Sequence, residues 1–146
     1  MTHDCYSTKR TTVWPQQKDG QPGFAVKYQD GYISWCPEAT FERDYRAVHG
    51  GHLSFGQAIE AMKAGKKVRR LGWNGKGMWV ALQSGSSFAA AYAKAGSPCE
   101  HRAAEGAETI NLMPHVDMRT ADGSMVIGWL ASQTDMLSDD WEEVVT

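Results

Sequence analysis

Cysteine is scarce in this sequence, and it is not arranged for metal or redox chemistry. The 146 residues contain three cysteines, Cys5, Cys36 and Cys99, which lie far apart and form no C-x-x-C pair. This spacing argues against a zinc knuckle or a thioredoxin-like motif, and it favours reduced thiols in a cytosolic protein. We therefore expect no metal and no cofactor.

Long apolar runs are absent as well. No stretch approaches the ~18 consecutive apolar residues that a membrane span requires. The first residues, MTHDCYSTKRTTVW, also lack the apolar centre of a signal peptide. We expect a cytoplasmic protein without a membrane anchor. The length suffices for one domain, or for one domain and a small module.

An excess of one charge is also missing. The chain has 15 lysines and arginines against 17 aspartates and glutamates, so its net charge is −2. Such a chain has no overall positive field with which to hold a long nucleic acid, and we expect no partner of that kind. Any site for an anion must be a local patch of basic residues.

The familiar catalytic motifs are not found. There is no nucleophile elbow, no phosphate loop of the G-x-x-x-x-G-K-[ST] type and no H-E-x-x-H. The glycine-rich stretch GWNGKG lacks the strand–glycine–helix context of a dinucleotide-binding fold. What the chain does have is six tryptophans, a residue favoured in binding pockets and interfaces. We expect binding rather than catalysis.

The N-terminal third predicts an arm followed by a small module. Residues 1–20 are polar and indicate an extended, loosely held arm. In GFAVKYQDGYISWCP, apolar residues alternate on both sides of Asp30-Gly31, which predicts a β-hairpin. Pro37 is placed to open a short helix, on which Phe41 and Tyr45 share a face. We predict a hairpin-helix module at 21–50, with AVHGGH as a hinge.

The rest of the chain, 51–146, predicts a second and larger domain. Ser54 and Gln57 form a capping-box pattern, so we predict a helix over 55–64 that ends at Gly65. KKVRRLG and GMWVALQ predict two strands joined by WNGK. TINLMPHVDMRT and SMVIGWLA predict a second hairpin, and WEEVV an edge strand. The long stretch 84–108 is small, polar and glycine-rich, which indicates a functional or disordered loop.

Together these elements predict an α+β fold. One helix packs on a mostly antiparallel, twisted sheet, and the small hairpin-helix module precedes it.

The first candidate site surrounds Asn74-Gly75, which indicates a turn. A run of six basic residues leads into it and past it, and its arginines, Arg69 and Arg70, suit phosphate oxygens. The same run also fits a solvated helix end and an edge strand. Trp73 at the turn could stack on a nucleobase, which is worth roughly 1–3 kcal/mol, or it could cover the helix. Trp79, inside the strand, is expected to pack in the sheet.

Two further groups carry polar side chains in suggestive patterns. His115 and Asp117 are two apart and share one face of a strand, where they could act as an acid–base pair or hydrogen-bond a ribose. Two such residues are too few for a metal site. Between Trp129 and Trp141 lies the run SQTD, which offers donors and acceptors for a sugar or base but also fits ordinary turn chemistry.

Two long segments go beyond spacing arguments. LSFGQAIEAMKAGKKVRRLGWNGKGMWV and LMPHVDMRTADGSMVIGWLASQTDMLSDDWEEV resemble the phage-encoded Thoeris anti-defence family of the second type. The resemblance covers residues 53–145. It implies a non-enzymatic sponge in the cytoplasm of the infected bacterium, which binds a cyclic ADP-ribose isomer made by TIR-domain sensors. It also implies a homotetramer with pockets between subunits and, in some members, a pocket for the cyclic dinucleotides of CBASS signalling.

The resemblance marks the residues that match the family's motifs as pocket candidates. These are Trp73, Asn74, Met78, His115, Asp117, Met118, Thr120, Trp129, Ser132, Gln133, Thr134 and Asp135. It suggests that Trp73 stacks on adenine, and that Asn74, Asp117 and Thr134 hydrogen-bond the sugar or the base. Arg69 and Arg70 would then meet the diphosphate.

Two other functions remain open at this point. The chain could hydrolyse the same cyclic nucleotides with His115 and Asp117 as acid and base. It could instead be a structural or interaction protein of a phage, with its tryptophans at a protein interface. The N-terminal module resembles a small module found in phage proteins and suggests no role.

Overall fold

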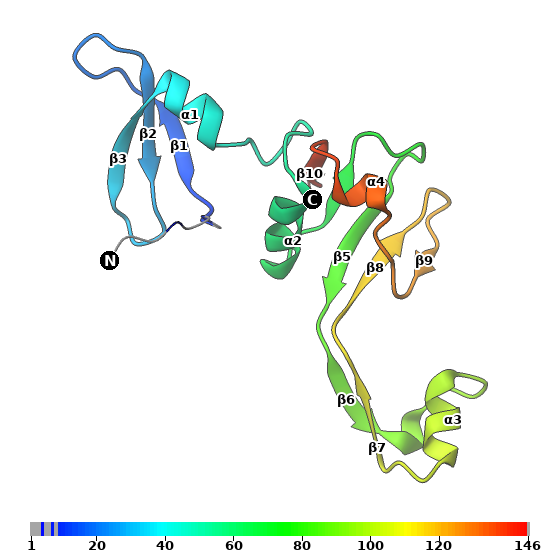
Figure 1. The fold of residues 1–146 in the computed structure, drawn as a ribbon. Coiled ribbons are helices and arrows are strands. Elements are labelled where there is room, and N and C mark those ends of the chain that lie inside the picture. The colour runs from blue at the N-terminus through cyan, green and yellow to red at the C-terminus, as the bar shows by residue number, and fades with distance from the viewer. Residues whose placement is uncertain (1–3, 5–6, 8, 146) are drawn as a thin grey trace.

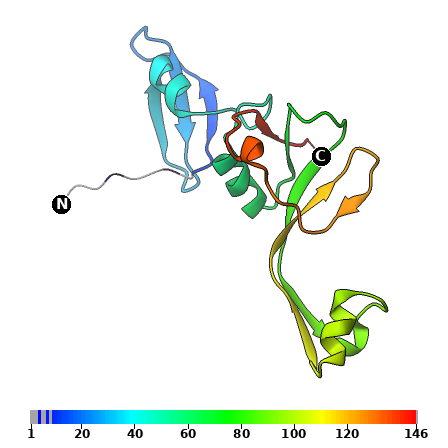
Figure 2. The same ribbon diagram turned by 45° about the vertical axis from the view of Figure 1, so that its right-hand side comes forward.

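The computed structural model describes residues 4, 7 and 9–145, and three parts follow one another along the chain. Figure 1 shows an N-terminal module, a central domain that contains α2 and most of the larger sheet, and an arm that projects from this sheet and carries α3 at its tip. The rotated view of Figure 2 shows the same separation. We call these parts the N-terminal module (12–46), the central domain (48–83 and 115–145) and the arm (84–114).

The N-terminal module is a three-stranded antiparallel sheet with one helix. The strands β1 (Thr12–Pro15), β2 (Gly23–Lys27) and β3 (Ile33–Pro37) lie in that order, and α1 (Glu38–Asp44) follows. The predicted hairpin is confirmed, because β2 and β3 pair with Lys27 opposite Ile33. Gly31, in the connecting loop, has φ 88°, a conformation that glycine adopts readily.

The prediction of a loosely held arm at 1–20 is wrong for its second half. Residues 12–15 form β1 and pair with β2 along their whole length. A tight turn makes this possible: Lys18 bridges to Gln21, and Asp19 and Gly20 both have positive φ, 51° and 77°. Positive φ at both central residues is the geometry of a two-residue hairpin turn. Residues 1–3, 5, 6 and 8 of the expected arm lie outside the described residues.

Aromatic stacking fixes α1 on one face of this sheet. The Phe24 ring of β2 stacks on Phe41 of α1 at 4.1 Å between centroids, and Phe41 stacks on Tyr45 at 4.7 Å. The shared face predicted for Phe41 and Tyr45 is therefore confirmed. Pro37 precedes the helix as its N-cap instead of opening it as the first helical residue.

The central domain contains a five-stranded sheet with β10 at one edge. The strands are β4 (Val68–Arg70), β5 (Trp79–Gln83), β8 (His115–Arg119), β9 (Met125–Val126) and β10 (Trp141–Glu143), in the order β10-β4-β5-β8-β9, and all their pairings are antiparallel. This arrangement confirms the predicted strand pair around WNGK and the edge strand. The second hairpin is confirmed only for its inner part, β8 and β9, because residues 109–112 pair with another strand in the arm and residues 127–131 form no strand. The α+β class is confirmed.

A helix of nine residues covers one face of this sheet. It is α2 (Phe55–Lys63), which begins with the predicted capping box of Ser54 and Gln57. Gly65 follows its end with φ 79°. The helix side chains pack on Val68, Val80 and Trp141, which are completely buried. Trp141, which belongs to the edge strand β10, is therefore part of the hydrophobic core.

The segment 84–108 is not the expected loop. It forms most of the arm, in which β6 (Ser86–Ala89) pairs with β7 (Thr109–Leu112). A 3₁₀ turn (Ala90–Tyr92) and α3 (Pro98–Ala104) lie between these strands. The signal for α3 was local: Ser97 caps the helix by accepting from the Glu100 amide, and proline occupies the first turn. None of the described helices is long and apolar enough to cross a membrane.

The expected hinge is also more ordered than predicted. Residues 48–53 run along the outer edge of β10, where Leu53 and Trp141 exchange two backbone hydrogen bonds and the Glu143 amide donates to the Val48 carbonyl. The Gly50 amide donates to the Glu142 carboxylate at 2.7 Å. The segment therefore acts as an added edge of the sheet.

Candidate functional site

A buried charge cluster ties β4 to the C-terminal segment. The Arg70 guanidinium donates to Asp140 at 2.7 Å through Nε and to Asp135 at 2.8 Å through Nη1. Its side chain is only 11% exposed. Because its N–H donors already bond to two carboxylates of the C-terminal segment, Arg70 stabilises the fold by joining that segment to β4. This geometry does not support its expected role at a diphosphate.

Asp135 is the centre of this cluster. It lies on the short helix α4 (Gln133–Met136), which begins with a capping box between Ser132 and Asp135. Burial alone would raise the pKa of Asp135, but hydrogen bonds from Arg70, Trp73 and Ser132 outweigh it and lower the pKa to about 2. Asp135 is therefore an ionised structural group at neutral pH. This helix is not among the predicted elements, although the spacing of Ser132 and Asp135 is a capping pattern.

Trp73 belongs to an aromatic cluster on the helix-covered face. Its indole Nε1 donates to Asp135 Oδ1 at 2.9 Å. Its ring meets Trp129 and Trp141 edge-on, at 6.0 and 5.3 Å between centroids. Aromatic rings favour this edge-to-face contact. Trp73 thus packs in the fold, and its expected stacking on a ligand stays a prediction.

An open depression lies beside this cluster, where β4 leads into the loop 71–78. Its volume is about 370 Å³. Loop glycines, two arginines, a lysine and apolar side chains line it: Arg69, Arg70, Leu71, Trp73, Gly75, Lys76, Gly77 and Met78. We call it the loop depression. Its volume falls in the range of small-molecule sites.

The loop depression has cations that the fold leaves accessible. Arg69 pairs with Glu142 at 2.7 Å but stays 40% exposed. Lys76 is exposed and makes no ion pair with any described residue. Asn74-Gly75 forms a bend within the loop instead of the predicted tight turn, and the positive φ lies at Gly77. The loop packs closely here, because a Cβ on Gly75 would lie 2.4 Å from Met78 Sδ. Asn74 is exposed on this loop but does not line the depression.

His115 and Asp117 lie on the other face of the sheet. Val116 and Met118 pack against the core beneath α2, and the alternation of a strand turns their neighbours away from it. His115 Nε2 is 3.4 Å from Asp117 Oδ1, and its Nδ1 is 2.8 Å from the Met113 carbonyl. Asp117 also accepts from the Gly128 amide at 3.1 Å. The predicted shared face is confirmed.

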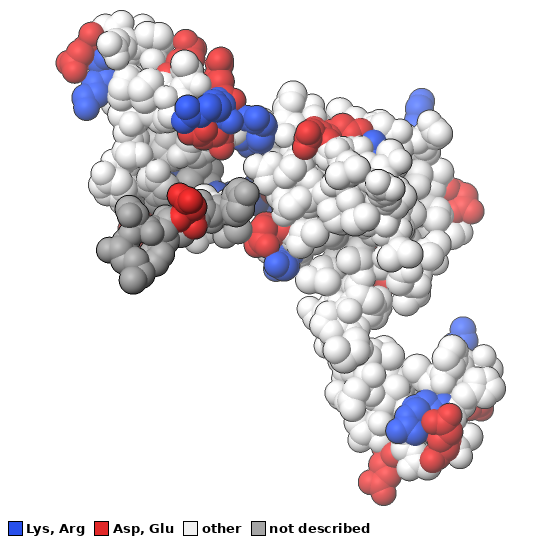
Figure 3. Space-filling view, in the orientation of Figure 1, with Lys and Arg blue, Asp and Glu red and all other residues white. Residues whose placement is uncertain are grey.

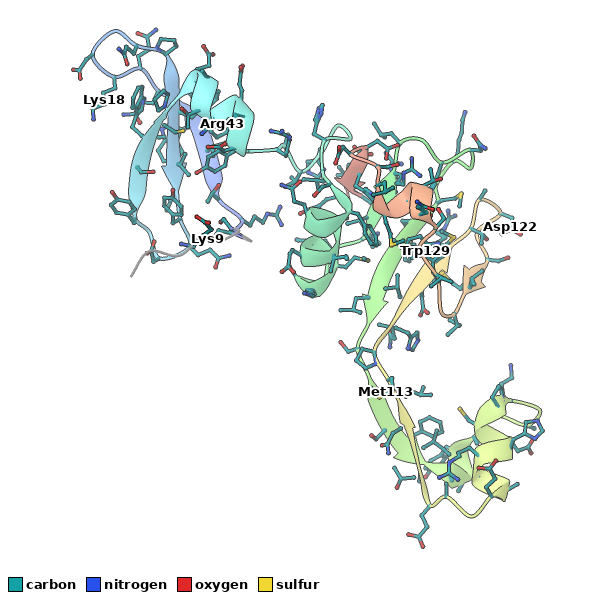
Figure 4. All side chains as sticks on the ribbon, in the orientation of Figure 1. Lys9, Lys18, Arg43, Met113, Asp122 and Trp129 are labelled. Atoms are coloured by element: carbon teal, nitrogen blue, oxygen red, sulfur yellow. The ribbon has the colours of Figure 1, made fainter. Side chains whose placement is uncertain are left out.

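The remaining candidates occupy turns and the outside of α4. Thr120 donates to Asp122 and holds the turn between β8 and β9. Gln133 and Thr134 are exposed on α4, and the Thr134 carbonyl accepts from Ser138. Figure 4 labels Trp129 beside this helix.

The predicted candidates therefore divide into two groups within one chain. One group surrounds the tryptophan cluster and the loop depression, and the other lies on the opposite face of the sheet. Among the described residues, no three histidine, cysteine or acidic side chains gather as metal ligands would.

Comparisons with known proteins cover the central domain and the arm. A family model described as "Thoeris anti-defense 2-like domain" matches residues 53–144. A protein named "Thoeris anti-defense 2" from Bacillus phage SP01 is 35% identical over 92 residues, which are 63% of this chain and 94% of that protein. The match includes the loop 71–78, β8 and α4, and it leaves out the N-terminal module. The chain belongs to the Thoeris anti-defense 2-like family, and its role is anti-defence on behalf of a phage.

Proposed function

We propose that the protein is a sponge for cyclic nucleotide signals in the cytoplasm of the infected bacterium. It binds a cyclic ADP-ribose isomer made by TIR proteins and keeps it from the downstream effector without cleaving it. Cyclic dinucleotides of CBASS signalling are a second class of ligand. The observation that carries the proposal is the loop depression, an open site with accessible cations inside the matched family domain.

The chemistry of the loop depression suits a nucleotide diphosphate. Lys76 and the exposed part of Arg69 supply positive charge, and charge-assisted hydrogen bonds to phosphate oxygens are among the stronger polar contacts. Trp73 and Met78 supply apolar surface for a base or a ribose. Asn74, next to the depression in sequence, would contribute a side-chain amide from the loop rim.

Contacts around His115 favour binding over turnover. Both ring nitrogens already face groups of this chain, the Met113 carbonyl and the Asp117 carboxylate. In this arrangement the imidazole orients Asp117, which would then accept a hydrogen bond from a ligand hydroxyl. The competing proposal is a hydrolase in which His115 and Asp117 exchange protons with the substrate.

Assembly into a homotetramer would bring the two groups of candidates together. A neighbouring subunit could place its His115 face beside the loop depression, which a single chain cannot do. The central domain also exposes apolar side chains near β9 and α4, among them Ile127 at 69% and Leu130 at 90% exposed. Figure 3 shows few charges on this part of the surface. Such a patch is typical of a protein interface.

Release of intact ligand is the decisive test. The purified protein is incubated with the cyclic ADP-ribose isomer, separated from free ligand and heat-denatured, and the released nucleotide is identified by mass spectrometry. A sponge releases the intact cyclic ligand, whereas a linear product would show hydrolysis. Thermal unfolding adds a second measurement, because ligand at 100 times its Kd stabilises the folded state by about 2.7 kcal/mol.

Matched variants separate the competing functions. Lys76→Ala should weaken binding, while Lys94→Ala on the arm, an exposed lysine outside the loop depression, should not. If the hydrolase proposal is right, the unaltered protein should cleave the nucleotide, whereas His115→Ala should bind it without cleaving it. If no cyclic nucleotide raises the melting temperature, the result would favour a structural or interaction protein of a phage.

A further inference from the structure

The N-terminal module has a second sheet face that α1 does not cover. The helix stacks on the face that presents Phe24. Cross-strand pairing places Trp14, Ala25 and Trp35 side by side on the opposite face, because directly paired residues point the same way. We call this the outer face. Its central strand positions are Thr12, Trp14, Ala25, Lys27, Ile33 and Trp35.

Trp35 lies flat on this face as a platform. A Cβ on Gly23 would lie 2.7 Å from two indole carbons of Trp35, so the ring rests directly on the glycine backbone. The Trp35 Nε1 donates to the Gln16 carbonyl at 2.9 Å, which fixes the ring across the sheet. A planar group on this ring would find a rigid aromatic surface. Trp14, on the same face, is 38% exposed and offers a second aromatic surface.

The charge on the outer face is of one sign. Lys18 Nζ lies 5.8 Å from the centroid of the Trp35 ring, and Lys27 is exposed on the neighbouring strand. None of the strand positions of this face is acidic, and the nearest aspartates in sequence, Asp19 and Asp30, belong to turns. Figure 4 labels Lys18 in the loop between β1 and β2, to the left of Arg43 of α1.

Two aromatic platforms with lysines beside them are the arrangement that holds short single-stranded nucleic acid. Bases stack on aromatic rings regardless of their identity, and lysines neutralise the phosphates between them. We propose that the outer face binds a short single-stranded segment of nucleic acid, with bases on Trp14 and Trp35 and phosphates at Lys18 and Lys27. The net charge of the whole chain does not oppose this, because the patch is local and the segment is short.

A proline-rich peptide is the competing occupant, since aromatic grooves also bind such peptides. The observations favour nucleic acid on two grounds. The Trp35 ring lies flat instead of standing as the wall of a groove. The charged groups beside it are lysines, which a phosphate backbone requires and a neutral peptide does not.

Fluorescence anisotropy of the full chain with a labelled oligothymidylate of about 12 nucleotides tests the proposal. We expect binding at low salt that weakens as salt is raised. Trp14→Ala should weaken binding at least about fivefold, as loss of one stacked base predicts. Lys18→Glu should weaken it as well and make it less sensitive to salt. Lys94→Glu on the arm makes the same change of charge and should have no effect.

Several outcomes would overturn the proposal. These are no anisotropy change at about 100 µM protein in 50 mM salt, an equal loss with Lys94→Glu, or unchanged binding by Trp14→Ala. A proline-rich peptide that quenches tryptophan fluorescence where the oligonucleotide does not would assign the face to a peptide. Lys18 is exposed, so Lys18→Glu should fold normally. It therefore still tests the proposal if Trp14→Ala fails to fold. Cyclic nucleotide binding in the loop depression should be the same in both module variants.

Discussion

The central domain and the N-terminal module share one plan but use tryptophan in different ways. Each is an antiparallel sheet with helix on one face, α1 in the module and α2 beside the short α4 in the central domain. The central domain turns Trp141 into its core and joins it edge-on to Trp73 and Trp129. The module instead places Trp14 and Trp35 on the face without a helix. A high tryptophan content therefore indicates neither a pocket nor a core until the facing side of the strand is known.

Charge differs between the two parts in the same way. In the central domain, Arg69 and Arg70 meet carboxylates from the distant C-terminal segment, and Lys76 stays unpaired among the described residues. On the outer face of the module, Lys18 lies over the Trp35 ring and makes no ion pair with any described residue. The comparison teaches that a basic run is a candidate anion site only where the fold leaves it unneutralised.

The largest expected difference between the two parts comes from truncating one tryptophan in each. Trp141 is fully buried, so Trp141→Ala should lower the free energy of unfolding by about 3–5 kcal/mol. Trp14→Ala removes a partly exposed ring and should cost much less. Urea unfolding followed by circular dichroism measures both. Equal losses would show that the outer face is as tightly packed as the core.

Removing the central carboxylate is expected to have the next largest effect. Asp135→Ala leaves the Arg70 guanidinium with one carboxylate instead of two and removes a partner of the Trp73 indole. Loss of one member of a buried pair is costly, and we expect about 3 kcal/mol. Asp139→Ala, an exposed carboxylate that makes no ion pair with any described residue, is the control. A small loss in Asp135→Ala would mean that Asp140 alone satisfies Arg70.

Acid should destabilise the central domain through the same carboxylate. The pKa of Asp135 is about 2 in the folded protein, below the value near 3.9 of an unfolded chain. Its contribution is therefore complete above about pH 5 and is lost as the pH falls through 2, and it amounts to roughly 2–3 kcal/mol. Unfolding measured between pH 5 and pH 2 tests this. In Asp135→Ala the dependence on pH should be weaker over that range.

The smallest expected effect concerns the ion pair that links Arg10, just before the module, to the central domain. Arg10 pairs with Glu143 at 3.1 Å, and the arginine is about half exposed. Such a pair contributes little in water, so Arg10→Ala should change stability by less than about 1 kcal/mol. Hydrogen exchange of residues 48–53 should stay slow in this variant, because their backbone bonds to β10 remain. Fast exchange there would show that Arg10 holds the module in place.

Local signals predicted much of this fold. Ser54 with Gln57 set the start of α2, and Asp30-Gly31 set the first hairpin. The same kinds of signal at Asp19-Gly20 and Ser97-Pro98 were present, yet β1 and α3 were not predicted. Polar composition around them suggested an arm and a loop, and composition is weaker evidence than turn and capping chemistry.

The site was harder to predict, because its contacts join distant residues. Arg70 and Asp135 are 65 positions apart, and only the pairing of β10 with β4 brings their segments together. The basic run therefore looked like a free phosphate site in the sequence. Asn74-Gly75 correctly placed a loop between β4 and β5, but that loop spans residues 71–78 and has its positive φ at Gly77, so it is longer than the tight turn that the dipeptide predicts.

The segment 48–53 has a consequence for where this protein can be divided. The family match begins at residue 53, yet Val48, His49 and Gly50 already bond to β10. A shortened protein that begins at residue 53 would lack residues 48–52, which cover the outer edge of β10. The backbone donors and acceptors of β10 at this edge would then be free to pair with another chain. A protein that begins before Val48 keeps this edge covered. Truncated or fused forms of the domain should therefore include residues 48–145.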